Sequence, residues 1–218
     1  TELPTSLTYT QPYQRGLIPV VFVHGTVSSP GRWANMLNDL ENDGRVRDRF
    51  QFWFFHYGTS SPIPYSAMLL RDALSEAVAR IDPDGTDPAL RQMVVVGHSQ
   101  GGLLTKMTAI DSGDRFWRLV SDRPLDDLRM DDSDREVVRK LAFVKPVPSV
   151  TPFIIDLPML SEVVKSLAVV SVQIPVAILV TADAASSADP MASVAMAAES
   201  IAPATNDDAL IPLAAIDP

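Results

Sequence analysis

Residues 93–102 read MVVVGHSQGG, an apolar and β-branched run that passes directly into a glycine-flanked polar turn. Met93 to Val96 predicts a strand buried on both faces of a parallel sheet, and a helical pattern begins at Gln100. Residues 97–101 fit G-x-S-x-G, which at a strand-to-helix junction projects the serine hydroxyl above the sheet. Ser99 is therefore the candidate nucleophile, and a glycine-rich turn without function is the alternative for this motif.

Two backbone amides are candidates for the oxyanion hole beside this serine. The amide of Gln100 opens the following helix, where the helix dipole favours a developing negative charge. The second donor is expected in the loop after the first strand, where the sequence VFVHGT places the amide of Thr26. Glycine at 97 and 101 would let strand and helix approach closely around a strained Ser99.

Segments on both sides of the motif alternate between strand and helix patterns. Strands are predicted over residues 17–23, 50–57 and 93–96, and helices over residues 33–40, 65–81 and 100–110. The inward side of the third helix is expected to carry Leu103, Leu104, Met107 and Ile110. This order predicts an α/β fold, a mostly parallel sheet with helices on both faces and a ligand site at the carboxyl ends of the strands.

The remainder of the chain is less regular. Residues 111–145 are charged and mixed, which indicates an excursion outside the sheet and a possible cap over the site. Its acidic part, residues 125–136, is either a solvated face or a docking segment for a basic partner. Further strands are predicted at 153–156, 175–182 and 209–216, with a weak helix at 191–201.

Composition excludes several classes of protein. A length of 218 residues with 46% hydrophobic residues fits one domain spanning 1–218. The formal net charge of -9 leaves no basic face for nucleic acid, and the absence of cysteine excludes a thiol nucleophile. No ligand spacing for a metal occurs, so neither a metal nor an organic cofactor is expected. The most apolar stretch, residues 167–180, is too short for a transmembrane segment, and the sequence is compatible with a cytoplasmic or an exported protein of any oligomeric state.

The stretches PYQRGLIPVVFVHGTVSSPGRW, FWFFHYGT and DPALRQMVVVGHSQGGLLTKMTAIDSGDRFW resemble bacterial members of the α/β-hydrolase superfamily, on its esterase and lipase side. The resemblance covers about residues 11–145. It implies the α/β-hydrolase fold and a triad of serine, acid and histidine in that chain order. Ser99 then corresponds to the nucleophile, with the amides of Thr26 and Gln100 as oxyanion donors.

The same resemblance implies a triad acid after a later strand. PVAILVTAD resembles the strand that delivers it, which makes Asp183 the first candidate, followed by Asp156 and Asp189; an ordinary loop or capping aspartate is the alternative for each. ALIPLAAIDP resembles the strand after which the triad histidine comes, so the domain is expected to lack its C-terminal end.

None of the three histidines lies where the general base is expected, because the base should follow Ser99 in the chain and no histidine follows His98. His24 is interpreted as a structural loop residue, and His98 is held on the rigid turn before Ser99. His56 is the one candidate for a base within these residues, although its position before Ser99 departs from the order that the resemblance implies.

Together these features predict a serine hydrolase that cleaves carboxylic esters through an acyl-enzyme on Ser99. The partner is expected to be a small or lipid-like ester, uncharged and moderately apolar, bound near Trp53, Phe54, Phe116 and Trp117. An amidase, thioesterase or lactonase of the same fold is an alternative, because such differences lie in pocket shape. A non-catalytic binding protein on a degraded hydrolase fold is the alternative from another class.

Overall fold

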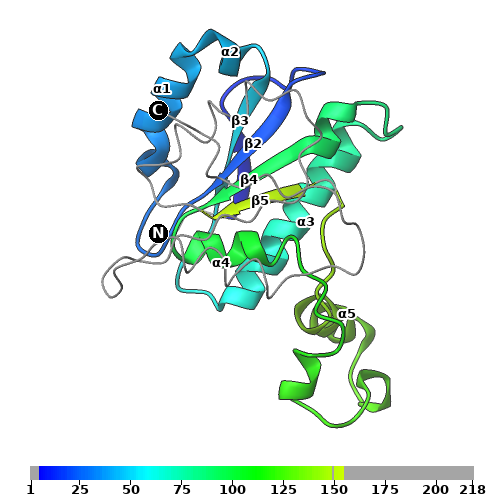
Figure 1. Ribbon diagram of the computed structural model, residues 1–218. Helices are drawn as coiled ribbons and strands as arrows, with labels where there is room; N and C mark the ends of the chain where they lie inside the picture. The colour runs from blue at the N-terminus through cyan, green and yellow to red at the C-terminus, as the bar shows by residue number, and fades with distance from the viewer. Residues whose placement is uncertain (1–4, 149, 155–218) are drawn as a thin grey trace, which may run out of the picture.

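A mixed five-stranded sheet forms the centre of the chain in the computed structural model, which describes residues 5–148 and 150–154 (Figure 1). The strands lie in the order β1-β3-β2-β4-β5, with β1 antiparallel to β3 and the other neighbours parallel. Their bounds are β1 Ser6–Tyr9, β2 Ile18–Val23, β3 Phe50–His56, β4 Met93–Gly97 and β5 Val150–Ile154. The mostly parallel sheet predicted from the sequence is confirmed.

Helices connect the strands of the described part. The α-helices are α1 Ala34–Asn42, α2 Gly44–Arg47, α3 Ile63–Ile81, α4 Gln100–Lys106 and α5 Asp132–Ala142. Short 3-10 turns precede or separate them: η1 Pro30–Trp33, η2 Pro88–Gln92, η3 Trp117–Leu119 and η4 Leu125–Asp127. None of the helices in residues 5–148 is long and apolar enough to cross a membrane.

Alternate residues of each central strand enter two separate cores. On β2, Val21 and Val23 join the core beneath α3 and α4, whereas Val20 and Phe22 join the core beneath α1 and α2. Because successive side chains of a strand point to opposite faces, buried strands of this kind need helices on both sides. Both predicted helical layers are thus present.

Details of the helices differ from the predictions. The buried centre of α3 consists of Ala67, Leu70, Leu74 and Ala77. α4 ends at Lys106, and Leu103 on it is 50% exposed, so the expected inward position of Leu103 is wrong. The reason is that Gly101 and Thr105 face β4, which turns Leu104 into the core and Leu103 away from it.

Residues 111–145, the excursion, begin shortly after α4 and return to the start of β5. Val150 of β5 lies in register with Met93, the first residue of β4, so the excursion returns at the amino ends of the parallel strands. Arg71 Nη2 on α3 donates to the carbonyl of Lys140 at 2.7 Å, which holds α5 against α3. Figure 1 shows α5 projecting away from the sheet. A cap over the strand carboxyl ends stays a prediction.

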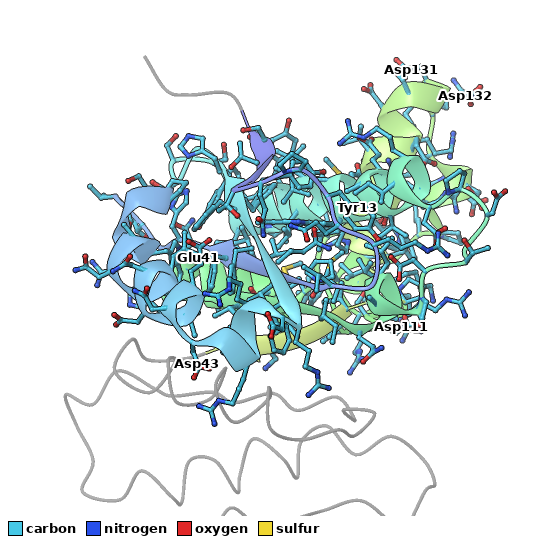
Figure 2. The ribbon with its side chains drawn as sticks, turned by 90° about the horizontal axis from the view of Figure 1, so that it is seen from above. Tyr13, Glu41, Asp43, Asp111, Asp131 and Asp132 are labelled. Carbon is cyan, nitrogen blue, oxygen red and sulfur yellow. The ribbon has the colours of Figure 1, made fainter. Side chains whose placement is uncertain are left out.

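Acidic side chains are spread over the molecule. Glu41 and Asp43 lie at one end and Asp131 and Asp132 at the tip of the excursion (Figure 2). Within the acidic segment 125–136, Asp131 accepts the amide of Asp134 at 2.8 Å and caps α5. The segment therefore has a local structural use, and docking of a basic partner stays a prediction.

Several predicted elements lie outside the described residues. These are the strands at 175–182 and 209–216, the weak helix at 191–201 and the end of the strand at 153–156. The described part of that last strand is β5, which begins at Val150, three residues earlier than predicted. Pro152 of β5 is compatible with a strand that has only β4 as a neighbour in the described part.

A buried carboxylate anchors the segment that leads into β4. Asp87 is 1% exposed, accepts the hydroxyl of Tyr13 and accepts the amides of Gly16 (3.1 Å) and Ala89 (3.0 Å). Burial alone would raise the pKa of Asp87, but its bonds with Tyr13, Gly16 and Ala89 outweigh burial and hold the pKa below its usual value. The ionised side chain thus ties the start of β2 to η2.

Replacing this carboxylate should destabilise the fold. We expect Asp87→Ala to lower the free energy of unfolding by about 3 kcal/mol at pH 7, because buried donors lose a charged acceptor. The pKa of Asp87 is depressed in the folded state, so its contribution is present above the ordinary aspartate pKa and disappears as the pH falls through the folded value. Urea unfolding between pH 3 and pH 7 measures the difference. The exposed Asp84→Ala is the control, and an equal loss in both variants would contradict the anchor.

Candidate active site

Ser99 lies at a strained turn between β4 and α4. Its backbone has φ 54° and ψ -123°, and its side chain is exposed. Only one other non-glycine residue in the described part, Val27, has a positive φ, at 50°. Such conformations cost about 1–3 kcal/mol and persist only where the surrounding structure enforces them. The sharp turn predicted from G-x-S-x-G is therefore present.

Two glycines permit the close approach that enforces this turn. A Cβ at Gly97 would lie 2.3 Å from the carbonyl oxygen of Gly101 and 2.4 Å from Thr105 Oγ1. A Cβ at Gly101 would lie 2.3 Å from the carbonyl oxygen of Val23 and 2.5 Å from that of His24. The obstacles are mostly main-chain atoms that cannot move aside. Any side chain at 97 or 101 would push α4 off the sheet.

Of the amides that follow Ser99, those of Gly101 and Gly102 bond to main-chain carbonyls. Gly101 donates to the carbonyl of His98 at 2.9 Å and Gly102 to that of Ser99 at 2.8 Å. Gln100 is the first residue of α4, where an amide has no acceptor within the helix. It is therefore available, on the side where the helix dipole is positive, for a negatively charged oxygen.

The second candidate donor, Thr26, lies in the exposed loop after β2. Gly25 precedes it, and a Cβ there would lie 3.0 Å from Ser99 Cβ, so this loop touches the nucleophile. The hydroxyl of Thr26 donates to Gln100 Oε1 at 2.8 Å. The structure thus brings Thr26, Ser99 and Gln100 together, as the sequence predicts.

His24 is a buried structural residue. It is 1% exposed, its ring stacks on Tyr57 with centroids 4.6 Å apart, and its Nδ1 donates to the carbonyl of Gly25 at 3.0 Å. Burial is the main cause that lowers the pKa of His24 below its usual value of 6.5, opposed by the Gly25 bond and aided by His56. A neutral ring bound to its own loop supports the backbone before Thr26.

The other two histidines also pack within the structure. The His98 ring lies edge-on to Trp33, with centroids 6.4 Å apart, on the α1 side of the sheet. The His56 ring packs against His24 at 5.5 Å. β2 lies between β3, which carries His56, and β4, so two strand spacings, about 10 Å, separate His56 from the strand that leads to Ser99. This placement does not favour His56 as the general base.

The aromatic residues expected to line an acyl pocket lie elsewhere. Trp53 is 1% exposed and packs edge-on against Tyr9 in the core under α3. Phe54 packs against Phe22 in the opposite core. In the excursion, Trp117 stacks on Phe143, and Phe116 packs against the first core. The pocket expected near these residues is therefore wrong, because alternation along β3 and the place of the excursion direct them into cores.

The candidate acids Asp183, Asp156 and Asp189 lie outside the described residues. Within the described part, no group of three or more His, Asp or Glu side chains could hold a metal ion. A shallow pocket of about 460 Å³ lies between Thr10, Tyr13 and Arg80, at the C-terminal end of α3 and distant from Ser99. Its hydroxyl groups belong to tyrosine and threonine and none lies at a strained turn, so the turn at residues 97–101, called the elbow below, remains the candidate active site.

Two residues of the site were not expected from the sequence. The carbonyl of Thr59, in the loop after β3, accepts Gln100 Nε2 at 3.4 Å, and its hydroxyl accepts the amide of Val27 at 3.3 Å. Val27 is 93% exposed despite its apolar side chain. Their position after two predicted strands was the only available signal, because no motif marks this threonine or this valine.

Solved structures similar to this chain include a lipase and two esterases. A lipase from Bacillus licheniformis in its mature form is 13% identical, with a TM-score of 0.37, over 68% of this chain and 70% of the lipase. A carboxyl esterase from the fungus Tuber melanosporum is 13% identical, with a TM-score of 0.36, over 71% and 66%. An esterase from Thermogutta terrifontis with propionate bound is 14% identical, with a TM-score of 0.36, over 69% and 65%. No protein with a curated description matches the sequence significantly.

The sequence model of the alpha/beta hydrolase family matches residues 20–215. This match begins within β2 and takes in β3, the elbow and α4, which are the elements that hold Thr26, Ser99 and Gln100. The chain therefore belongs to the α/β hydrolase family.

Proposed function

We propose that this chain is the catalytic domain of a serine hydrolase that cleaves carboxylic esters. Ser99 Oγ would attack the carbonyl carbon and lose its proton to a general base, and the amides of Thr26 and Gln100 would bind the resulting oxyanion. The alcohol leaves with the proton, and water then hydrolyses the acyl-enzyme on Ser99. Asp183 is the proposed acid of the triad.

The observation that carries this proposal is the backbone of Ser99. A serine with φ 54° is exposed at the start of a helix, with the loop of Thr26 in contact. Strain of this kind is kept where a side chain must be presented to a ligand. Membership of the α/β hydrolase family agrees with a hydrolase, but it does not identify which kind of bond is cleaved.

The general base is the member of the triad for which the described histidines offer no well-placed candidate. The sequence holds no histidine after His98, and His24, His56 and His98 are placed in structural roles. We therefore assign the nucleophile and the oxyanion donors, and we assign none of these three histidines as the base. A binding protein without catalysis is favoured instead if no group of the protein can take the proton from Ser99.

The substrate is proposed to be uncharged and moderately apolar. Support comes from Val27, whose exposed side chain follows the oxyanion donor Thr26 directly. Amides and thioesters present the same carbonyl to the same amides, so amidase and thioesterase activities are the alternatives within this site.

Reaction of Ser99 with a fluorophosphonate tests the nucleophile. We expect the full-length protein to gain the mass of one phosphonyl group, because a working base and oxyanion hole activate a single serine. Ser99→Ala should gain none, and Ser75→Ala, which changes an exposed serine of α3, should react like the wild type. Intact mass spectrometry gives the answer. An unmodified wild type with intact fold would move the binding-protein alternative to first place.

Acyl preference tests the proposed substrate. We expect kcat/KM for butyrate and octanoate esters to exceed that for a succinate monoester by about tenfold or more, since a buried or partly buried carboxylate without a cation partner is disfavoured. Val27→Asp should narrow this preference and slow the apolar esters. Faster turnover of the charged ester by the wild type would refute an apolar substrate.

A further inference from the structure

Two loops and the start of a helix meet at one side chain beside the candidate nucleophile, the carboxamide of Gln100. The Gln100 carboxamide accepts the Thr26 hydroxyl at its oxygen, 2.8 Å away, and donates from its nitrogen to the Thr59 carbonyl at 3.4 Å. The loop after β2, the loop after β3 and the start of α4 are thereby joined. The contact with Thr26 is the shorter one and the stronger by geometry.

Thr59, in the loop after β3, also bonds to Val27, which has a positive φ. Thr59 Oγ1 accepts the amide of Val27 at 3.3 Å, and Val27 has φ 50°. A β-branched residue is rarely found in this region, because its Cβ is close to the backbone there. Thr26, whose own N–H lies in the peptide with Gly25, is therefore held through its side chain by Gln100 and through the amide of the next residue, Val27, by Thr59.

We propose that the Gln100 side chain is a positioning residue that holds the Thr26 amide in place for the oxyanion. Gln100 then has two separate roles, since its own backbone amide is the other donor. This inference rests on the proposed function, in which both amides bind the oxyanion. Misplacement of a reacting group by about 1 Å can cost up to a hundredfold in rate, so a side chain that fixes this loop affects catalysis without touching the substrate.

A double-mutant cycle separates this role from general stability. Thr26→Val removes the hydroxyl but keeps shape and backbone amide, and Gln100→Met removes the carboxamide but keeps its length. Each is expected to lower kcat for an ester by about tenfold with KM within twofold, because the hole forms fully only in the transition state. The double variant should also lose about tenfold, since both changes break one contact.

Conservative and distant variants serve as controls. Thr26→Ser retains the hydroxyl and should recover most of the kcat that Thr26→Val loses. Thr8→Val and Gln92→Met each remove an exposed bond to a carbonyl remote from Ser99, and neither should change kcat. Losses that multiply to about a hundredfold in the double variant, or an inactive Thr26→Ser, would overturn the proposal.

A readout that needs no activity keeps the inference separate from the proposed function. In NMR relaxation of the full-length protein, the order parameters of the Thr26 and Val27 amides should fall in Gln100→Met from about 0.85 to below about 0.6, and stay unchanged in Gln92→Met. Unchanged values would overturn the positioning role. If Ser99 fails to react with the fluorophosphonate, the proposed function fails, and this measurement alone decides whether Gln100 holds the loop.

Discussion

The main-chain contact between α4 and the carboxyl ends of β2 and β4 is the constraint on which the site depends. Gly101 lies so close to the carbonyls of Val23 and His24 that no Cβ fits, and Gly97 lies equally close to Gly101. Chain connectivity then leaves Ser99 only the sharp turn with positive φ. The exposed hydroxyl, the free first amide of α4 and the contact with Gly25 all follow from this approach.

Buried polar groups support the same edge from below. The hydroxyl of Tyr57 donates to the His24 carbonyl at 2.8 Å, one of the two carbonyls that face Gly101, and burial raises the pKa of Tyr57 to about 12. The neutral His24 ring stacks on the Tyr57 ring. Because Tyr57 and His24 remain uncharged at neutral pH, no charge repulsion between these two buried side chains disturbs the loop before Thr26.

The sequence was informative where one physical effect dominated. Continuous apolar runs gave β2, β3 and β4 to within a residue or two, since strands buried on both faces admit little else. β1 was missed because an edge strand of four residues, three half-buried and one exposed, carries almost no periodic signal. α5 was missed too, although Asp131 capping Asp134 and the apolar positions after it are a recognisable helix start.

The residues of the candidate site show the same difference. Ser99, Gln100 and Thr26 could be predicted because the proposed chemistry requires a nucleophile and amides at fixed places along the chain. Thr59 and Val27 were not, because their contacts depend on how the loops after β2 and β3 meet, which no local pattern encodes. The expected aromatic pocket was wrong for a related reason. Aromatic side chains are attractive both to a core and to an apolar ligand, and only the register of β3 distinguishes the two for Trp53.

The stabilising carboxylate and the strained residues therefore lie at opposite ends of the parallel strands. At the amino ends of the strands, Asp87 holds the start of β2 and the turn before β4 through satisfied buried bonds. At the carboxyl ends lie the two strained residues, Val27 and Ser99, joined through exposed or half-buried contacts of Gln100 and Thr59. The well-bonded amino ends of the strands can support strain at the carboxyl ends, because the buried strands β2 and β4 run directly from one end to the other.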